Sequence, residues 1–175
     1  MTGNEPRLGV LAVGGSTVVL RKAVEGDIPA LVQLLAADQL GATRDGAAGE
    51  DDLQPYLRAF HAVDADPAHL LLVAVAVDDD NADDDVDVIA TMQLSILPGL
   101  ARRGALRAQI EAVRVRADHR SRGLGAALVE WAIAEARRRG CALVQLTTDK
   151  SRADAHRFYE RLGFVASHEG LKLHL

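Results

Sequence analysis

With 175 residues, 49% hydrophobic and 26% charged, the chain suits one domain with a sizeable hydrophobic core. The net charge of −5 argues against a nucleic-acid partner, and an aromatic content of 3% argues against a base-stacking surface. The single cysteine, Cys141, excludes an internal disulfide and favours a reducing compartment. The apolar run from Leu8 to Val13 is too short to span a membrane. We therefore expect a cytoplasmic protein with no membrane partner.

The first half of the chain predicts two short helices and a hairpin. Residues 1–16 are expected to be a flexible N-terminal tail, and residues 17–175 a single domain. A helix is expected to begin after Asp27 as its N-cap, because Ile28, Leu31 and Leu34 follow at helical spacing. The other expected elements are a strand at 17–21, a glycine-rich loop at 41–49, a helix at 53–62, and hairpin strands at 70–77 and 86–97 joined by an acidic turn at 78–85.

The second half alternates strands and helices. We expect strands at 110–115 and 143–147, helices at 126–139 and 154–162, and two closing strands at 164–167 and 171–175. Gly140 is expected to end the first of these helices. This order predicts a mixed α/β fold with a mostly antiparallel central sheet flanked by helices.

Between the predicted strand and helix lies a loop that carries two glycines, Gly123 and Gly125. The first turn of a helix has unpaired N–H groups and the positive end of the helix dipole, so it can hold a phosphate. Arg120 and Arg122 add positive charge at the same place. The pattern favours a nucleotide-type cofactor, although an ordinary loop before a helix also fits it.

Two common phosphate motifs do not match this loop. A Walker loop has Lys followed by Ser or Thr after its last glycine, whereas Ala126 and Ala127 stand here. The dinucleotide fingerprint needs a third small residue at a fixed position and a later acidic residue. Asp149 could supply the acid, but the loop has only two glycines and begins with Arg.

A second motif follows from Ala155 to Phe164. Arg120, Gly123 and Gly125 match the pattern Arg/Gln-x-x-Gly-x-Gly/Ala, and Ala155, Phe158, Tyr159, Gly163 and Phe164 match Ala-x-x-Phe/Leu-Tyr-x-x-x-Gly-Phe. In this order, the two motifs resemble those of the GCN5-related N-acetyltransferase (GNAT) family, over roughly residues 105–175.

The resemblance implies a GNAT-like acyl-CoA N-acyltransferase fold. It implies an enzyme that moves the acetyl group of acetyl-CoA, its co-substrate, directly to a primary amine of a small molecule or protein. Glu111 would deprotonate the amine, directly or through water, and Tyr159 would protonate the departing sulfur. The implied cofactor-binding residues are Val113, Arg114, Val115, Arg120, Ser121, Arg122, Gly123, Leu124, Gly125, Ala126 and Arg152.

Other interpretations stay open beside this one. Glu111 also fits a strand residue that faces solvent or pairs with an Arg, and a carboxylate acts as a base near neutral pH only where burial favours its protonated form. Tyr159 also fits simple packing. Many family members have Asn where Arg152 stands, so Ser151 or Arg152 would have to replace that contact. The rival functions are a CoA-binding sensor or scaffold without turnover, and the transfer of a longer acyl group.

We expect no metal site. The aspartate run at 78–85 lacks the Gly and terminal Glu of a calcium loop and is typical of a solvated hairpin tip, and the six His residues show no ligand spacing. The acidic residues Asp45, Glu50, Asp51 and Asp52 hint at a cationic acceptor, such as a polyamine, an aminoglycoside or a protein amino group. The acceptor site is expected to be formed by the first two helices, their glycine-rich loop and the last hairpin. The sequence leaves open whether the chain forms a homodimer.

Overall fold

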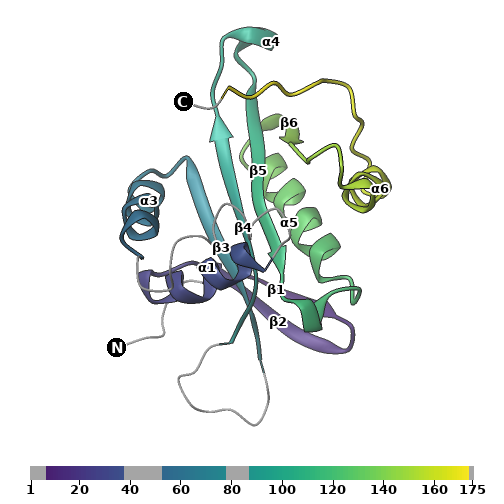
Figure 1. Ribbon diagram of the computed structural model, residues 1–175. Helices are drawn as coiled ribbons and strands as arrows, with labels where there is room; N and C mark the ends of the chain where they lie inside the picture. Colours follow the sequence, from purple (N-terminus) through teal and green to yellow (C-terminus); the bar gives the residue numbers. More distant parts are fainter. Residues whose placement is uncertain (1–6, 38–52, 78–86, 174–175) are drawn as a thin grey trace.

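The computed structural model describes residues 7–37, 53–77 and 87–173, and its strands form a single sheet (Figure 1). The strand order is β1-β2-β3-β4-β5-β6, and neighbours are antiparallel except β5 and β6, which are parallel. The strands are β1 (Arg7–Val13), β2 (Ser16–Lys22), β3 (His69–Ala76), β4 (Val88–Leu97), β5 (Leu106–Val115) and β6 (Cys141–Leu146). The predicted α/β fold with a mostly antiparallel sheet flanked by helices is confirmed.

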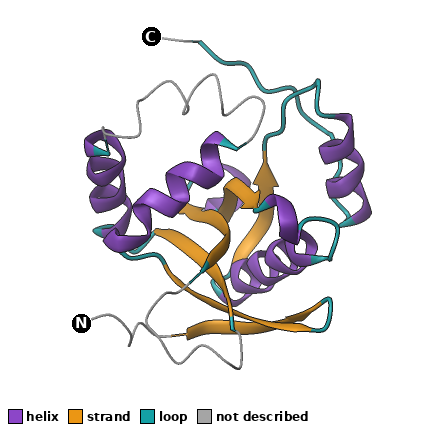
Figure 2. Cartoon of the chain, turned by 60° about the horizontal axis from the view of Figure 1, so that its bottom comes forward, coloured by secondary structure: helices purple, strands orange, loops and turns teal. Residues whose placement is uncertain are grey.

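Helices cover both faces of this sheet (Figure 2). On one face, α1 (Ile28–Ala36) and α3 (Gln54–Asp64) bury Ile28, Leu31 and Phe60 against β2, β3 and β4. On the other face, the longest described helix, α5 (Leu124–Arg138), buries Leu128 and Val129 in the larger core cluster. The shorter helix α6 (Ala153–Arg161) lies beyond α5 (Figure 1). The remaining short turns are η1 (Glu25–Asp27), α4 (Ala101–Gly104) and η2 (Ala117–His119).

The N-terminal segment is a strand where the sequence suggested a flexible tail. Residues from Arg7 onward pair with β2 in an antiparallel hairpin, and Gly14 (φ 59°) and Gly15 (φ 83°) form its turn. The expectation of a tail through residue 16 is therefore wrong for residues 7–16. Leu8, Leu11 and Val13 of β1 pack against the core, which supplies the stabilisation that a free tail would lack.

Most other predicted elements are confirmed with small shifts in their ends. The helix predicted at 126–139 begins earlier, at Leu124, with Gly123 as its N-cap. Asp27 does precede α1, but its carboxylate accepts hydrogen bonds from Arg21 and from the Val24 N–H, with no side-chain bond to the helix. The predicted loop at 41–49 and the acidic turn at 78–85 lie outside the described residues.

The closing strands predicted at 164–167 and 171–175 are wrong within the described residues. Residues 164–173 contain no strand, and Val165, Leu171 and Leu173 are 81%, 95% and 87% exposed. Alternation of apolar and polar residues predicts a strand only where a neighbouring strand supplies its hydrogen bonds, and in this structure β6 is paired with β5 alone.

Candidate active site

The site begins where β5 separates from β6. The parallel pairing of these strands runs from Leu106 to Ile110 of β5, so the residues after Ile110 have no registered partner on β6. On the other side, Gln93 of β4 pairs with Glu111, and Thr91 pairs with Arg114, which leaves one extra residue in β5. Ala112 in this bulge has φ 53°, a left-handed conformation that costs an L-residue about 1–2 kcal/mol. The bulge redirects the last residues of β5 into a cleft.

This cleft is strongly basic. It encloses about 600 Å³ between the end of β5, the loop before α5 and helix α6. Five arginines and one aspartate line it, and the aspartate, Asp154, forms an ion pair with Arg157 of the same helix. The lining residues are Val113, Arg114, Val115, Arg120, Ser121, Arg152, Asp154, Arg157 and Arg161. Such a concentration of guanidinium groups in an otherwise acidic protein suits an anionic ligand.

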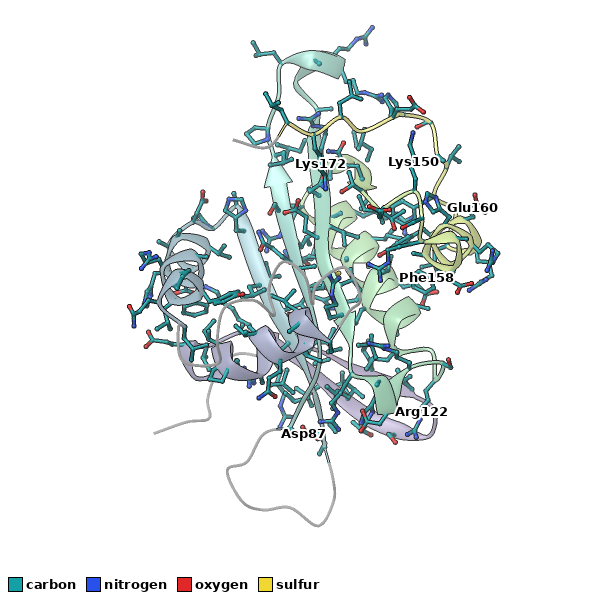
Figure 3. All side chains as sticks on the ribbon, viewed as in Figure 1. Asp87, Arg122, Lys150, Phe158, Glu160 and Lys172 are labelled. Carbon is teal, nitrogen blue, oxygen red and sulfur yellow. The ribbon has the colours of Figure 1, made fainter. Side chains whose placement is uncertain are left out.

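The loop before α5 has the conformation expected of an anion-binding turn. Ser121 has φ 60° and Gly123 has φ 91°, so the backbone turns sharply before the first N–H groups of α5. Gly125 lies close to α6, since a Cβ placed on it would lie 3.6 Å from Phe158 Cζ. Phe158 accordingly lies on the α5 side of α6, and Glu160 does not (Figure 3).

Not all of the sequence-predicted cofactor residues reach this cleft. Val113, Arg114, Val115, Arg120, Ser121 and Arg152 line it together. Arg122 and Leu124 instead line a separate hollow of about 200 Å³ beside the β1–β2 hairpin, and Arg122 lies at that end of the molecule (Figure 3). Leu124 is only 2% exposed and belongs to the core. Gly123, Gly125 and Ala126 are near the cleft through the loop and the first turn of α5 that they form.

Two backbone carbonyls at the end of β5 accept hydrogen bonds from arginine side chains. The Arg114 Nη1 donates to the Val113 carbonyl at 2.9 Å, and the Arg120 Nε donates to the Val115 carbonyl at 2.9 Å. The side chains of Val113 and Val115 are half-buried against the core on the α5 face. Both residues also line the cleft, beside the arginines that bond their carbonyls.

Tyr159 packs against the core near two cleft residues, Arg114 and Arg152, whose charges act on it. Its ring makes edge contacts with Phe158 and Phe164, with centroid distances of 4.9 Å and 5.8 Å. Burial raises the pKa of the Tyr159 hydroxyl above its ordinary value, while the nearby positive charges of Arg152 and Arg114 act to lower that pKa. The net rise keeps the phenol protonated through the neutral range, which is the form that can donate a proton.

Glu111 is exposed, directly beside the bulge. The sequence prediction of its place, on the strand before the loop, is confirmed by β5. Its carboxylate is open to solvent among the described side chains.

Sequence reasoning missed Arg157 and Arg161, which line the same cleft from α6. Their i,i+4 spacing places both on one face of the helix, which begins after Arg152. This spacing is visible in the sequence, but the motif there is written around Phe158 and Tyr159, and the arginines occupy its variable positions.

The chain belongs to the acetyltransferase (GNAT) family, which matches residues 30–164. A curated relative, the aminoalkylphosphonate N-acetyltransferase of Salmonella typhimurium, is 42% identical over 60 residues, which are 34% of this chain and 39% of that protein. The chain therefore matches well under half the length of this relative.

Solved structures resemble the fold over most of its length. A transcriptional regulator from Bacillus halodurans is 43% identical with a TM-score of 0.80, covering 90% of this chain and 99% of that chain. A protein from Agrobacterium tumefaciens is 30% identical with a TM-score of 0.71, covering 89% of this chain and 99% of that chain. A structure from Clostridium acetobutylicum containing acetyl-CoA shares the fold at 20% identity and a TM-score of 0.63, covering 90% and 96%.

Two other kinds of site were sought in the part of the chain that the structure describes. No group of three His, Cys, Asp or Glu residues there is placed to hold a metal ion. No helix of that part is long and apolar enough to cross a membrane.

Proposed function

We propose that the protein is an N-acetyltransferase that transfers the acetyl group of acetyl-CoA to a primary amine. The observation that carries this proposal is the basic cleft at the split between β5 and β6, with Tyr159 near enough to its residues Arg114 and Arg152 for their charges to act on the phenol. Glu111 precedes the cleft residues on the same strand, β5. Membership of the acetyltransferase family supports it.

The charge of the residues that line the cleft suits acetyl-CoA. Arg120, Ser121 and the N–H groups at the start of α5 would hold the pyrophosphate, with Arg152, Arg157 and Arg161 opposite them. The freed edge of β5 from Val113 to Val115 would offer main-chain groups to the amide-containing arm, once the guanidinium groups of Arg114 and Arg120 move off its carbonyls. Gly125, at the start of α5, lies beside Phe158 and the Val115 side chain.

Bound acetyl-CoA would supply an activated acyl group with a thiolate as leaving group. Tyr159 would donate its proton to that sulfur, because its raised pKa keeps the hydroxyl protonated at working pH. The positive charges of Arg114 and Arg152, which act on Tyr159, would also stabilise negative charge as it develops nearby.

Glu111 would accept a proton from the amine, directly or through one water. Because Glu111 is exposed, the bound acceptor itself would have to cover the carboxylate and exclude water from it. The amine would then attack the acyl carbon directly, with no covalent enzyme intermediate.

Two alternatives remain beside this function. The Bacillus halodurans relative is named a transcriptional regulator, and a regulator that binds acetyl-CoA without turnover would use the same cleft. The second alternative, a longer acyl group, differs only at the thioester end of the site.

The deciding experiment combines a direct titration with acetyl-CoA and a turnover assay with a panel of primary amines. Binding at micromolar concentration together with release of CoA that depends on the amine supports the proposal. Binding without turnover of any amine supports the regulator, and preference for a longer acyl-CoA supports the second alternative. No binding by a folded sample would remove all three.

A further inference from the structure

The face of the sheet under α1 and α3 changes from apolar to polar along its strands. Under these helices the face presents Val73, Val75 and Val88, all buried. Further along β3 and β4, side chains on the same face are His69, Gln93 and Ser95. Burying polar residues on a sheet face costs stability unless they are hydrogen-bonded. A group of them in one part of the face therefore suggests a function beyond packing.

Four polar side chains on this face form a continuous row across four strands. The register pairs His69 of β3 with Ser95 of β4, Ser95 with Gln109 of β5, and Gln109 with Gln145 of β6. The His69 Nδ1 and Ser95 Oγ share a hydrogen bond of 2.8 Å, and the Gln145 Nε2 donates to Gln109 Oε1 at 2.7 Å. Below, the name polar row means His69, Ser95, Gln109 and Gln145.

Glu111 lies directly beside the polar row. It is two residues from Gln109 on the same face of β5, and its partner across the strands, Gln93, donates to Ser95 Oγ at 3.4 Å. His69, Gln109 and Gln145 are each half-buried, so they keep surface available for a ligand. With strands about 4.8 Å apart, the row extends about 14 Å, which is longer than a simple alkylamine requires.

We propose that the polar row binds the body of the acceptor, and that the acceptor is a primary amine rich in hydroxyl or amide groups, of the amino-sugar class. This inference rests on the proposed function, which places the reacting nitrogen at Glu111. Amide and hydroxyl side chains both donate and accept hydrogen bonds, as hydroxyl groups of a sugar do. A site of this kind rejects analogues that lack those groups, because its own polar atoms are then left unpaired.

The charges near the polar row disfavour the other acceptor classes. A polyamine needs several carboxylates, whereas among the described residues of the row and its direct strand neighbours Glu111 alone carries one. Asp66, near the other end, accepts the Ala68 N–H and lies 3.8 Å from His69 Nε2. An aminoalkylphosphonate needs cations near the amine to bind its phosphonate group. Arg114 lines the cofactor cleft instead, and Arg107 lies about 13 Å from Glu111 along β5.

The test compares glucosamine with spermidine, aminomethylphosphonate and propylamine as acceptors. We expect kcat/KM for glucosamine to exceed that for each of the others by about tenfold or more. In Gln109→Leu and Gln145→Leu this preference over propylamine should fall about tenfold, mainly through KM, while Gln33→Leu, an exposed glutamine of α1, should leave it unchanged. A purely structural effect would lower the rates with glucosamine and propylamine equally, and would overturn the inference.

A second readout needs no turnover. Calorimetric titration of glucosamine into the protein saturated with CoA should show binding in the wild type and in Gln33→Leu, and about tenfold weaker binding in the two row variants. Preference for spermidine or aminomethylphosphonate would overturn the inference, and so would a protein that binds acetyl-CoA but neither binds nor acetylates glucosamine. Failure to bind acetyl-CoA would instead remove the proposed function itself, so the two failures are distinguishable.

Discussion

The basic cleft lies at the end of β5, the polar row crosses the same strand at Gln109, and the two are built in opposite ways. The cleft collects five arginines and several residues in left-handed backbone conformations, whereas the polar row is uncharged at its glutamines and serine and lies on regular strand pairing. Guanidinium groups hold an anion of any orientation strongly, and neutral hydrogen-bonding side chains hold a particular pattern of donors and acceptors. The first arrangement suits a common co-substrate, and the second suits selection of an acceptor.

We expect the largest loss of activity on changing Glu111, which lies on β5 between Gln109 of the polar row and Arg114 of the cleft. Glu111→Gln should lower kcat/KM for the amine about a thousandfold at neutral pH, because the base is lost while the shape is kept. The defect should shrink as pH rises, since an amine of ordinary pKa near 10 then loses its proton without help. Steady-state rates across pH 7 to 10 measure this. A defect that is constant across the range would contradict the role of Glu111 as a base.

Tyr159→Phe should lower kcat about a hundredfold and leave acetyl-CoA affinity nearly unchanged, because the ring contacts with Phe158 and Phe164 remain. Since burial raises the pKa of Tyr159 above 10.0, the wild-type rate should fall only when the pH exceeds 10. The same rise means that a contribution of Tyr159 to stability is complete below pH 10 and is lost as pH rises through the raised pKa. An unaltered kcat would eliminate the proton-donating role.

The arginines of α6 should affect binding alone. Arg161→Ala should weaken acetyl-CoA binding about tenfold, or about 1.4 kcal/mol, and the loss should be smaller at high salt. Arg58→Ala, an exposed arginine of α3 outside the cleft, is the matched control. Calorimetric titrations at two ionic strengths test the pair, and equal affinities for the two variants would show that net charge alone matters.

The smallest expected effect separates backbone strain from binding. Gly123→Ala and Gly15→Ala both place a Cβ on a left-handed residue, at φ 91° and φ 83°, and each should cost about 1 kcal/mol of stability. Only Gly123 precedes α5 at the cleft, so only Gly123→Ala should also weaken acetyl-CoA binding. Chemical denaturation and titration with acetyl-CoA of both variants check this. An equal loss of affinity in both would contradict a role of the loop before α5 in binding acetyl-CoA.

The sequence reveals the cleft and conceals the polar row for a physical reason. The cleft is formed by two short motifs, so residues such as Arg120, Gly123 and Tyr159 are recognisable within a few positions of one another. The polar row brings together His69, Ser95, Gln109 and Gln145 from four strands, and only the register shows that they are neighbours.

The same distinction accounts for the errors in the predicted fold. The strand β1 was predicted as a tail because its glycine-containing sequence has weak local preference and is stabilised by pairing with β2. The closing segment from Phe164 has the alternation of a strand but no strand partner in the described structure. The side chain of Arg122 was predicted with the loop, yet it turns to the hollow beside Val13, which its position in the chain does not show.

The most direct test of this division is a calorimetric titration of acetyl-CoA into three proteins: the wild type, Arg152→Ala/Arg161→Ala and Gln109→Leu/Gln145→Leu. The account predicts binding in the micromolar range, about −8 kcal/mol, for the wild type and for the glutamine double variant, with at least about tenfold weaker binding for the arginine double variant. Equal affinity in all three folded proteins, or weakened binding in the glutamine variant alone, would contradict the assignment of the cleft to acetyl-CoA.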